Sequence, residues 1–146
     1  MNSLKPILLV EDSAKDVELT LAALEESHLA NRVIVLRDGS EALQYLHDHS
    51  SGSDEDFPAV MLLDIKMPKV SGIEVLRAIK GSPDLRRVPV VMLTSSREGP
   101  DLNECYELGA NGYVVKPVDF SEFFEAVKSL GKYWAVVNEP PALKKD

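Results

Sequence analysis

Acidic, hydroxyl and cationic side chains follow short apolar runs in this chain, each at the point where the run ends. Glu11 and Asp12 follow ILLV, Asp64 follows AVMLL, Thr94 follows VPVVML and Lys116 follows GYVV. Short apolar runs bounded by turn formers are typical of strands buried on both faces. If these runs form parallel strands, their polar side chains meet at one edge of the sheet.

Three carboxylates held close together repel one another unless a proton or a cation lies among them. Mg²⁺ prefers carboxylate oxygens and water, and it leaves positions free for phosphate oxygens. We therefore expect Glu11, Asp12 and Asp64 to bind Mg²⁺ or Mn²⁺ and to serve phosphoryl transfer. A single acid in such a position more often caps a helix or faces water. That interpretation does not account for three acids together with Thr94 and Lys116.

The elements that would position these side chains alternate along the chain. Helix-capping residues such as Ser13 and Asp38, and apolar residues at helical spacing, predict a helix after each apolar run. The predicted strands are 7–10, 32–36, 59–63, 88–93 and 112–115, and the last three predicted helices are 72–80, 100–108 and 121–134. Short connections between them predict an α/β domain with helices on both faces of a parallel sheet.

Size and charge limit the classes of partner. The chain has 146 residues and a formal net charge of -8, which suits one domain and disfavours nucleic acid. The first apolar run is too short for a signal peptide or a membrane span, so we expect a cytoplasmic protein. We expect a domain over 1–137 and a flexible tail over 138–146. The single cysteine, Cys105, is interpreted as a structural thiol.

Four segments together resemble a known family: LLVED, LLDIKMPKVSG, VVMLTSS and GANGYVVKP. Their order and placement are similar to the receiver domain, the phospho-acceptor module of two-component response regulators. The resemblance covers roughly residues 7–130. It implies a doubly wound, flavodoxin-like fold of five parallel strands in the order 2-1-3-4-5 with five helices. It also implies a phospho-acceptor, not an enzyme, that assists its own phosphorylation and dephosphorylation.

The resemblance assigns a role to each residue at the sheet edge. Asp64 would accept a phosphoryl group from a phosphohistidine on a sensor histidine kinase. Glu11, Asp12, Asp64 and the backbone carbonyl of Lys66 would hold Mg²⁺. Lys116 would contact the phosphoryl oxygens.

The resemblance also implies a switch. Pro117 would follow a cis peptide that directs the preceding lysine. Thr94 would bond the new phosphoryl group, and Tyr113 would move inward behind it. These movements would change the surface of the fourth helix, fifth strand and fifth helix. Lys66 departs from the family pattern, and with Ser96 it predicts an altered phosphate lifetime.

No DNA-binding or enzymatic domain follows the receiver-like region, so we expect a stand-alone regulator with output through protein contacts or a phosphorelay. The long loop before the third strand and the pair Tyr133-Trp134 resemble single-domain regulators of bacterial phytochrome kinases. Trp134 would either support a homodimer through the C-terminal helix region or fold over its own domain.

Three other classes of protein are less compatible with the sequence. An aspartyl-phosphate hydrolase would carry an acid in place of Lys66. A nucleotide-binding module would have a glycine-rich first turn in place of 11–13. A receiver that only binds partners would not need complete acceptor, metal and lysine positions.

Overall fold

Five parallel strands form one sheet with helices on both of its faces. The computed structural model describes residues 5–26, 31–50, 55–94, 99–115 and 120–132. Within these ranges the elements are β1 (Ile7–Val10), α1 (Ala14–Glu26), β2 (Val33–Leu36), α2 (Gly39–Asp48), β3 (Val60–Leu63), α3 (Gly72–Lys80), β4 (Val90–Thr94), α4 (Gly99–Glu107), β5 (Gly112–Val115) and α5 (Phe120–Lys132). The strand order is β2-β1-β3-β4-β5. The predicted fold class is therefore confirmed.

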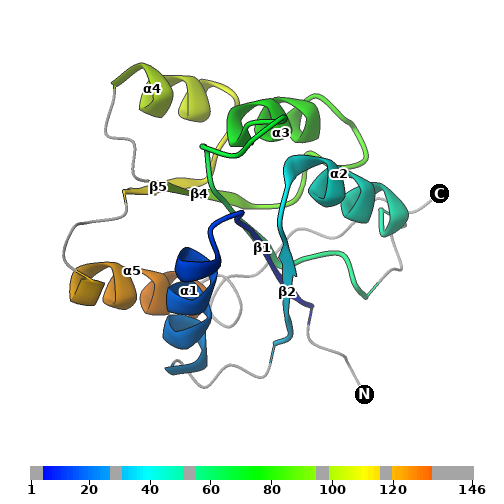
Figure 1. Cartoon of the computed structure of the whole chain (residues 1–146). Coiled ribbons are helices and arrows are strands. Elements are labelled where there is room, and N and C mark those ends of the chain that lie inside the picture. The colour runs from blue at the N-terminus through cyan, green and yellow to red at the C-terminus, as the bar shows by residue number, and fades with distance from the viewer. Residues whose placement is uncertain (1–4, 27–30, 51–54, 95–98, 116–119, 133–146) are drawn as a thin grey trace.

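The sheet separates two apolar cores. Helices α1 and α5 lie side by side on one face, and α2, α3 and α4 lie on the other (Figure 1). Alternate strand residues enter each core, so that Ile7 packs toward the α1 side and Leu8 toward the α2 side. Every residue of β1 and β3 is buried, whereas every residue of the edge strands β2 and β5 is only half-buried.

The register of the central strands places their ends at one level. Val10, the last residue of β1, pairs with Leu36 of β2 and with Leu63 of β3. The next residues continue this alignment, because the Glu11 amide donates to the Leu36 carbonyl at 3.0 Å and the Asp64 amide donates to the Val10 carbonyl at 3.1 Å. The acids that follow β1 and β3 consequently emerge next to each other.

Several predicted boundaries differ from the structure. The starts of the second and third strands, the end of the fourth strand and both ends of the fourth helix differ by one residue. The fourth strand begins at Val90 and not at Val88. Pro89 has no N–H to donate to a ladder, although its carbonyl accepts from the Met61 amide at 2.9 Å. The last helix begins at Phe120, one residue before its predicted start. Its predicted end at Trp134 and the predicted tail 138–146 lie outside the described residues.

The turn between β3 and α3 contains a strained residue. Lys69 has φ +67°, and the Val70 amide donates to the Pro68 carbonyl at 2.8 Å, which together define a γ-turn of the rare, strained form. Glycine has no Cβ and adopts a positive φ without this strain. We expect Lys69→Gly to raise the free energy of unfolding by about 0.5–1 kcal/mol in urea titrations. Lys69→Ala keeps the strain, so an equal gain in that variant would contradict the role of backbone strain.

Among the described residues, no helix combines the length and the apolar character that a membrane crossing requires.

Candidate functional site

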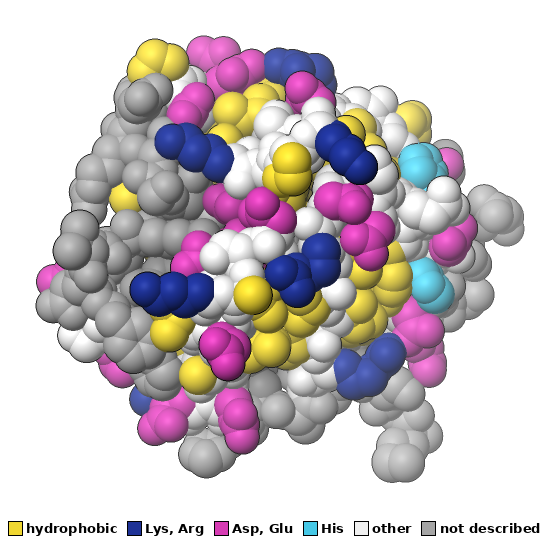
Figure 2. Space-filling model, viewed as in Figure 1, with side chains coloured by type: hydrophobic (Ala, Val, Ile, Leu, Met, Phe, Trp, Pro, Cys, Tyr) yellow, Lys and Arg dark blue, Asp and Glu magenta, His cyan; other side chains and the backbone are white. Residues whose placement is uncertain are grey.

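Three carboxylates from two neighbouring strands lie together at the carboxyl edge of the sheet. Glu11 and Asp12 follow β1, Asp64 follows β3, and each offers an oxygen within 4.8 Å of the others. Glu11 is 2% exposed and Asp64 is 6% exposed, whereas Asp12 is half-buried. In Figure 2, acidic side chains gather near the middle of the visible face, where the β1–α1 turn lies in Figure 1, and basic side chains are spaced around them.

The turn that carries Glu11 and Asp12 is held by several hydrogen bonds. The Ser13 amide donates to Glu11 Oε2 at 3.2 Å, and the Ser13 hydroxyl accepts from the Asp16 amide at 3.3 Å. The second bond is an N-terminal cap of α1, at the position that the sequence predicts. From the neighbouring strand, Arg37 Nη2 donates to the Asp12 carbonyl at 2.9 Å.

The start of α3 packs against the backbone of Asp64. The Gly72 amide donates to the Ile65 carbonyl at 2.8 Å, and a Cβ on Gly72 would lie 2.0 Å from the Asp64 carbonyl oxygen. The Ser71 hydroxyl caps this helix by accepting from the Glu74 amide at 3.3 Å. Only a residue without a side chain lets the helix approach the Asp64 backbone so closely.

The donor set suits a hard divalent cation. Carboxylate oxygens are the ligands that Mg²⁺ and Mn²⁺ prefer, and a divalent cation would offset the mutual repulsion of the three acids. The side chain of Lys66, two residues after Asp64, is exposed.

The other predicted site residues are only partly described. Thr94 ends β4 and pairs with Val115, the residue before Lys116, but the side chain of Thr94 lies outside the described residues. The predictions for Ser96, Lys116 and Pro117 also concern residues outside the described ranges. Tyr113 is half-buried on β5, and its ring centroid lies 6.4 Å from that of Tyr106 on α4.

Helix α4 is attached to the domain by few side chains. Cys105 is its one fully buried side chain among those described, and Tyr106 is 50% exposed. Arg77 Nη2 of α3 donates to Glu104 Oε2 of α4 at 2.6 Å, between two half-exposed side chains. Exposed ion pairs of this kind contribute at most about 1 kcal/mol.

Burial gives Cys105 an unreactive thiol. Desolvation, reinforced by the charges of Asp101 and Glu104, raises its pKa to about 11 from 9.0. At pH 9 we expect iodoacetamide to alkylate Cys105 at least about fiftyfold more slowly than an ordinary thiol, because the folded protein holds far less thiolate and also buries the side chain completely. Intact-mass time courses measure this rate. Protein unfolded in urea should react at the ordinary rate, and equal rates in both states would contradict the assignment.

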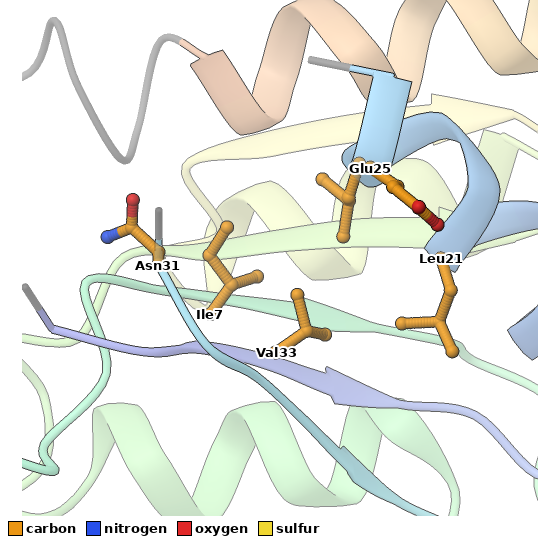
Figure 3. Close-up of a pocket in the computed structure, with 6 residues that line it drawn as sticks. Ile7, Leu21, Glu25, Asn31 and Val33 are labelled. Carbon is orange, nitrogen blue, oxygen red and sulfur yellow. The ribbon is translucent and has the colours of Figure 1, made fainter. Parts of the chain in front are cut away.

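A separate hollow lies at the opposite edge of the sheet. It has a volume of about 330 Å³, and Ile7, Leu21, Leu24 and Val33 supply its aliphatic lining, with Glu25 and Asn31 beside them (Figure 3). Ile7 and Val33 begin their strands, so the hollow lies at the amino ends and not at the carboxyl ends. One carboxylate in an aliphatic lining does not provide a cation site comparable to the acidic cluster.

Comparison with known proteins matches most of the chain to one family. Residues 7–128 match the response regulator receiver domain. The chain belongs to this family. Receiver domains are phospho-acceptors that bind a divalent metal and work with a histidine kinase. The expected relationship to two-component response regulators is thereby confirmed.

Several similar receivers have phytochrome-related names. The response regulator Rcp1 of Synechocystis is 38% identical over 97% of this chain and 96% of its own length. Its Mn²⁺-bound crystal structure has a TM-score of 0.84, covering 96% of this chain and 100% of that chain. The phosphorylated cyanobacterial phytochrome response regulator RcpA is 37% identical with a TM-score of 0.84, covering 94% and 98%. The bacteriophytochrome response regulator AtBRR is 58% identical with a TM-score of 0.70, covering 94% and 99%.

Two residues that support the acidic site are absent from the sequence prediction. Arg37 directly follows the apolar run of β2. A polar side chain directly after an apolar run is the signal that predicts the acids, and the same signal points to Arg37. Gly72 enters the sequence analysis only as the first residue of the predicted helix 72–80, and its close approach to Asp64 depends on how α3 packs. A glycine shortly after an acid at a strand end is the signal that points to it.

Proposed function

We propose that this protein is a response regulator that accepts a phosphoryl group on Asp64, with Mg²⁺ or Mn²⁺ held by Glu11, Asp12, Asp64 and the backbone carbonyl of Lys66. The observation that carries the proposal is the convergence of three carboxylates within 4.8 Å in a receiver domain. The Mn²⁺-bound form of Rcp1 and the phosphorylated form of RcpA support the cation and the phosphoryl chemistry, respectively.

The proposed reaction is an in-line transfer to one oxygen of Asp64. A P–N bond of the kinase phosphohistidine breaks as an O–P bond to Asp64 forms, and the leaving imidazole nitrogen takes a proton. Phosphoryl transfer passes through a loose transition state, so the protein mainly aligns the attacking oxygen and neutralises charge. A divalent cation held by Glu11, Asp12 and Asp64 would neutralise charge on the transferred phosphoryl group. We propose that Lys116 supplies the second positive charge there.

The fixed backbone around Asp64 supports its role as nucleophile. Its amide is bonded to β1, and its carbonyl group contacts α3 at Gly72, so the backbone that carries the carboxylate is held in place. Positioning of this kind lowers the entropy cost of bringing two reacting groups together. We propose that the same site assists hydrolysis of the acyl phosphate, with Lys66 and Ser96 setting its rate.

We propose that phosphorylation switches the α4-β5-α5 surface through Thr94 and Tyr113. The sparse attachment of α4 supports this, because a helix with one fully buried described side chain can move at little cost. The contact between Tyr113 and Tyr106 offers a direct connection between β5 and α4. Output would occur through protein contacts or a phosphorelay, without DNA binding.

The names of RcpA and AtBRR favour a phytochrome-type histidine kinase as the partner. A homodimer through the C-terminal helix region, a domain boundary near 137 and a cytoplasmic location are further predictions from the sequence. Gel filtration of wild type and Trp134→Ala tests the dimer, since an unchanged elution volume from a monomeric parent would exclude it.

The central test is incubation with acetyl phosphate and Mg²⁺ followed by intact-mass measurement. We expect the mass of one phosphoryl group to be added, and EDTA to prevent the addition. Hydroxylamine, which cleaves acyl phosphates, should remove it. A protein that remains unmodified under these conditions, while still folded, would be a receiver that only binds partners.

A further inference from the structure

The end of edge strand β2 holds the turn that carries two of the three carboxylates. Residues Glu11, Asp12 and Ser13 lie between β1 and α1, outside any regular element. Two hydrogen bonds reach this turn from the last residue of β2 and the residue that follows it: the Leu36 carbonyl accepts from the Glu11 amide at 3.0 Å, and Arg37 Nη2 donates to the Asp12 carbonyl at 2.9 Å. Strand β2 itself contributes no carboxylate to the acidic cluster.

The turn needs such support because of its charge. Three carboxylates within 4.8 Å repel one another, and the half-buried Asp12 is the member of the cluster with the most room to move toward solvent. A bond from the guanidinium to the Asp12 carbonyl opposes this movement, and a charged donor makes it stronger than a neutral bond. The guanidinium donates to the backbone carbonyl of Asp12. It therefore affects the carboxylate by fixing the position of the backbone that carries it.

We infer that Arg37 is a positioning residue for cation binding: it clamps the β1–α1 turn so that the Asp12 carboxylate stays directed at Asp64. This inference rests on the proposed phospho-acceptor function. A positive charge near a cation site has two opposite effects. By simple repulsion Arg37 weakens the binding of Mg²⁺ or Mn²⁺, whereas by holding the turn it strengthens that binding. Holding the turn is the larger of the two effects.

The two effects give opposite signs on substitution, which makes the inference testable. If Arg37 acts as a clamp, Arg37→Ala and Arg37→Gln bind Mn²⁺ about fivefold more weakly than wild type, the value of one hydrogen bond. Arg37→Lys, which keeps a charged donor, should recover part of the loss. If Arg37 acts through charge alone, the Ala and Gln variants bind Mn²⁺ more tightly than wild type and the Lys variant is unchanged.

Arg32 provides the matched control. It is exposed, lies before β2 at the end of the strand opposite Arg37, and pairs with Asp56 far along the chain. Arg32→Ala removes the same formal charge without touching the turn, so its Mn²⁺ affinity should equal that of wild type. Calorimetric Mn²⁺ titration measures the affinities, and amide hydrogen exchange of 12–13 should be faster in Arg37→Ala than in wild type.

Each outcome decides between the alternatives. Weaker binding in Arg37→Ala and Arg37→Gln, with wild-type affinity in Arg32→Ala, supports the clamp. Unchanged or tighter binding in the Arg37 variants overturns it, and so does an equal loss in Arg32→Ala. A lowered melting temperature with wild-type Mn²⁺ affinity would show a structural role only and would also overturn it. Absence of Mn²⁺ binding and of phosphorylation in wild type would instead contradict the proposed function.

Discussion

We expect Asp64→Asn to lower phosphoryl incorporation from acetyl phosphate by at least about a thousandfold, because the substitution removes the nucleophile and leaves no equivalent oxygen in its place. Asparagine has nearly the same shape as aspartate, so the surrounding backbone contacts should remain. Intact-mass measurement in the presence of Mg²⁺ gives the result directly. Incorporation at the wild-type level would show that another side chain accepts the phosphoryl group.

The unfolding temperature of Asp64→Asn shows whether this variant is folded. Removing one of three clustered carboxylates relieves repulsion, so we expect Asp64→Asn without metal to unfold at the same or a higher temperature than wild type. It should also bind Mn²⁺ more weakly. Asp84→Asn, the same chemical change at an exposed acid between α3 and β4, should leave incorporation and Mn²⁺ binding unchanged.

Gly72→Ala should destabilise the protein by about 3 kcal/mol or more, because its Cβ would lie 2.0 Å from the Asp64 carbonyl oxygen and 2.8 Å from the Ile65 Cα. Both neighbours are backbone atoms, so either α3 or the Asp64 backbone must move. A loss of this size lowers the melting temperature by roughly 10 °C in a domain of this length. Since the movement displaces Asp64, phosphorylation should also slow in the molecules that remain folded.

Gly112→Ala is the matched control for this substitution. The three atoms nearest to a Cβ there belong to the Val91 side chain, the nearest at 3.5 Å, which is an ordinary van der Waals distance. We expect a change of less than about 1 kcal/mol and normal phosphorylation. Equal losses in both variants would mean that the position of Gly72 next to Asp64 has no special importance.

The sequence predicts the position of the clustered acids better than it predicts the contacts that support them. Asp64 and Glu11 can be predicted because an acid directly after a buried apolar run lies at the sheet edge, where parallel strands bring such side chains together. The bond from Arg37 to Asp12 and the approach of Gly72 to Asp64 depend on strand register and helix packing, which no local pattern contains. Lys69 is a similar case, because lysine itself gives no indication of a left-handed backbone.

Element boundaries are also predicted correctly where local residues mark them and wrongly where hydrogen bonds between strands set them. The prediction for α3 matches its observed bounds, Gly72–Lys80, because Ser71 caps its start and Gly81 follows its last residue. The predicted start of β4 is wrong by two residues, because Val88 is apolar and buried without being part of the ladder. Burial therefore indicates the segment correctly, and hydrogen bonding decides where the strand begins.

The uneven burial across the sheet has a consequence for how such a protein can diversify. Strands β1 and β3, which carry the acids, are buried along their whole length, whereas the outer strand β5 is half-buried beside the lightly held α4. We expect the centre to be stiff and the rim to be compliant. Substitutions in β5 and α4 can then create new partner preferences, while the position of Asp64 at the end of β3 is preserved.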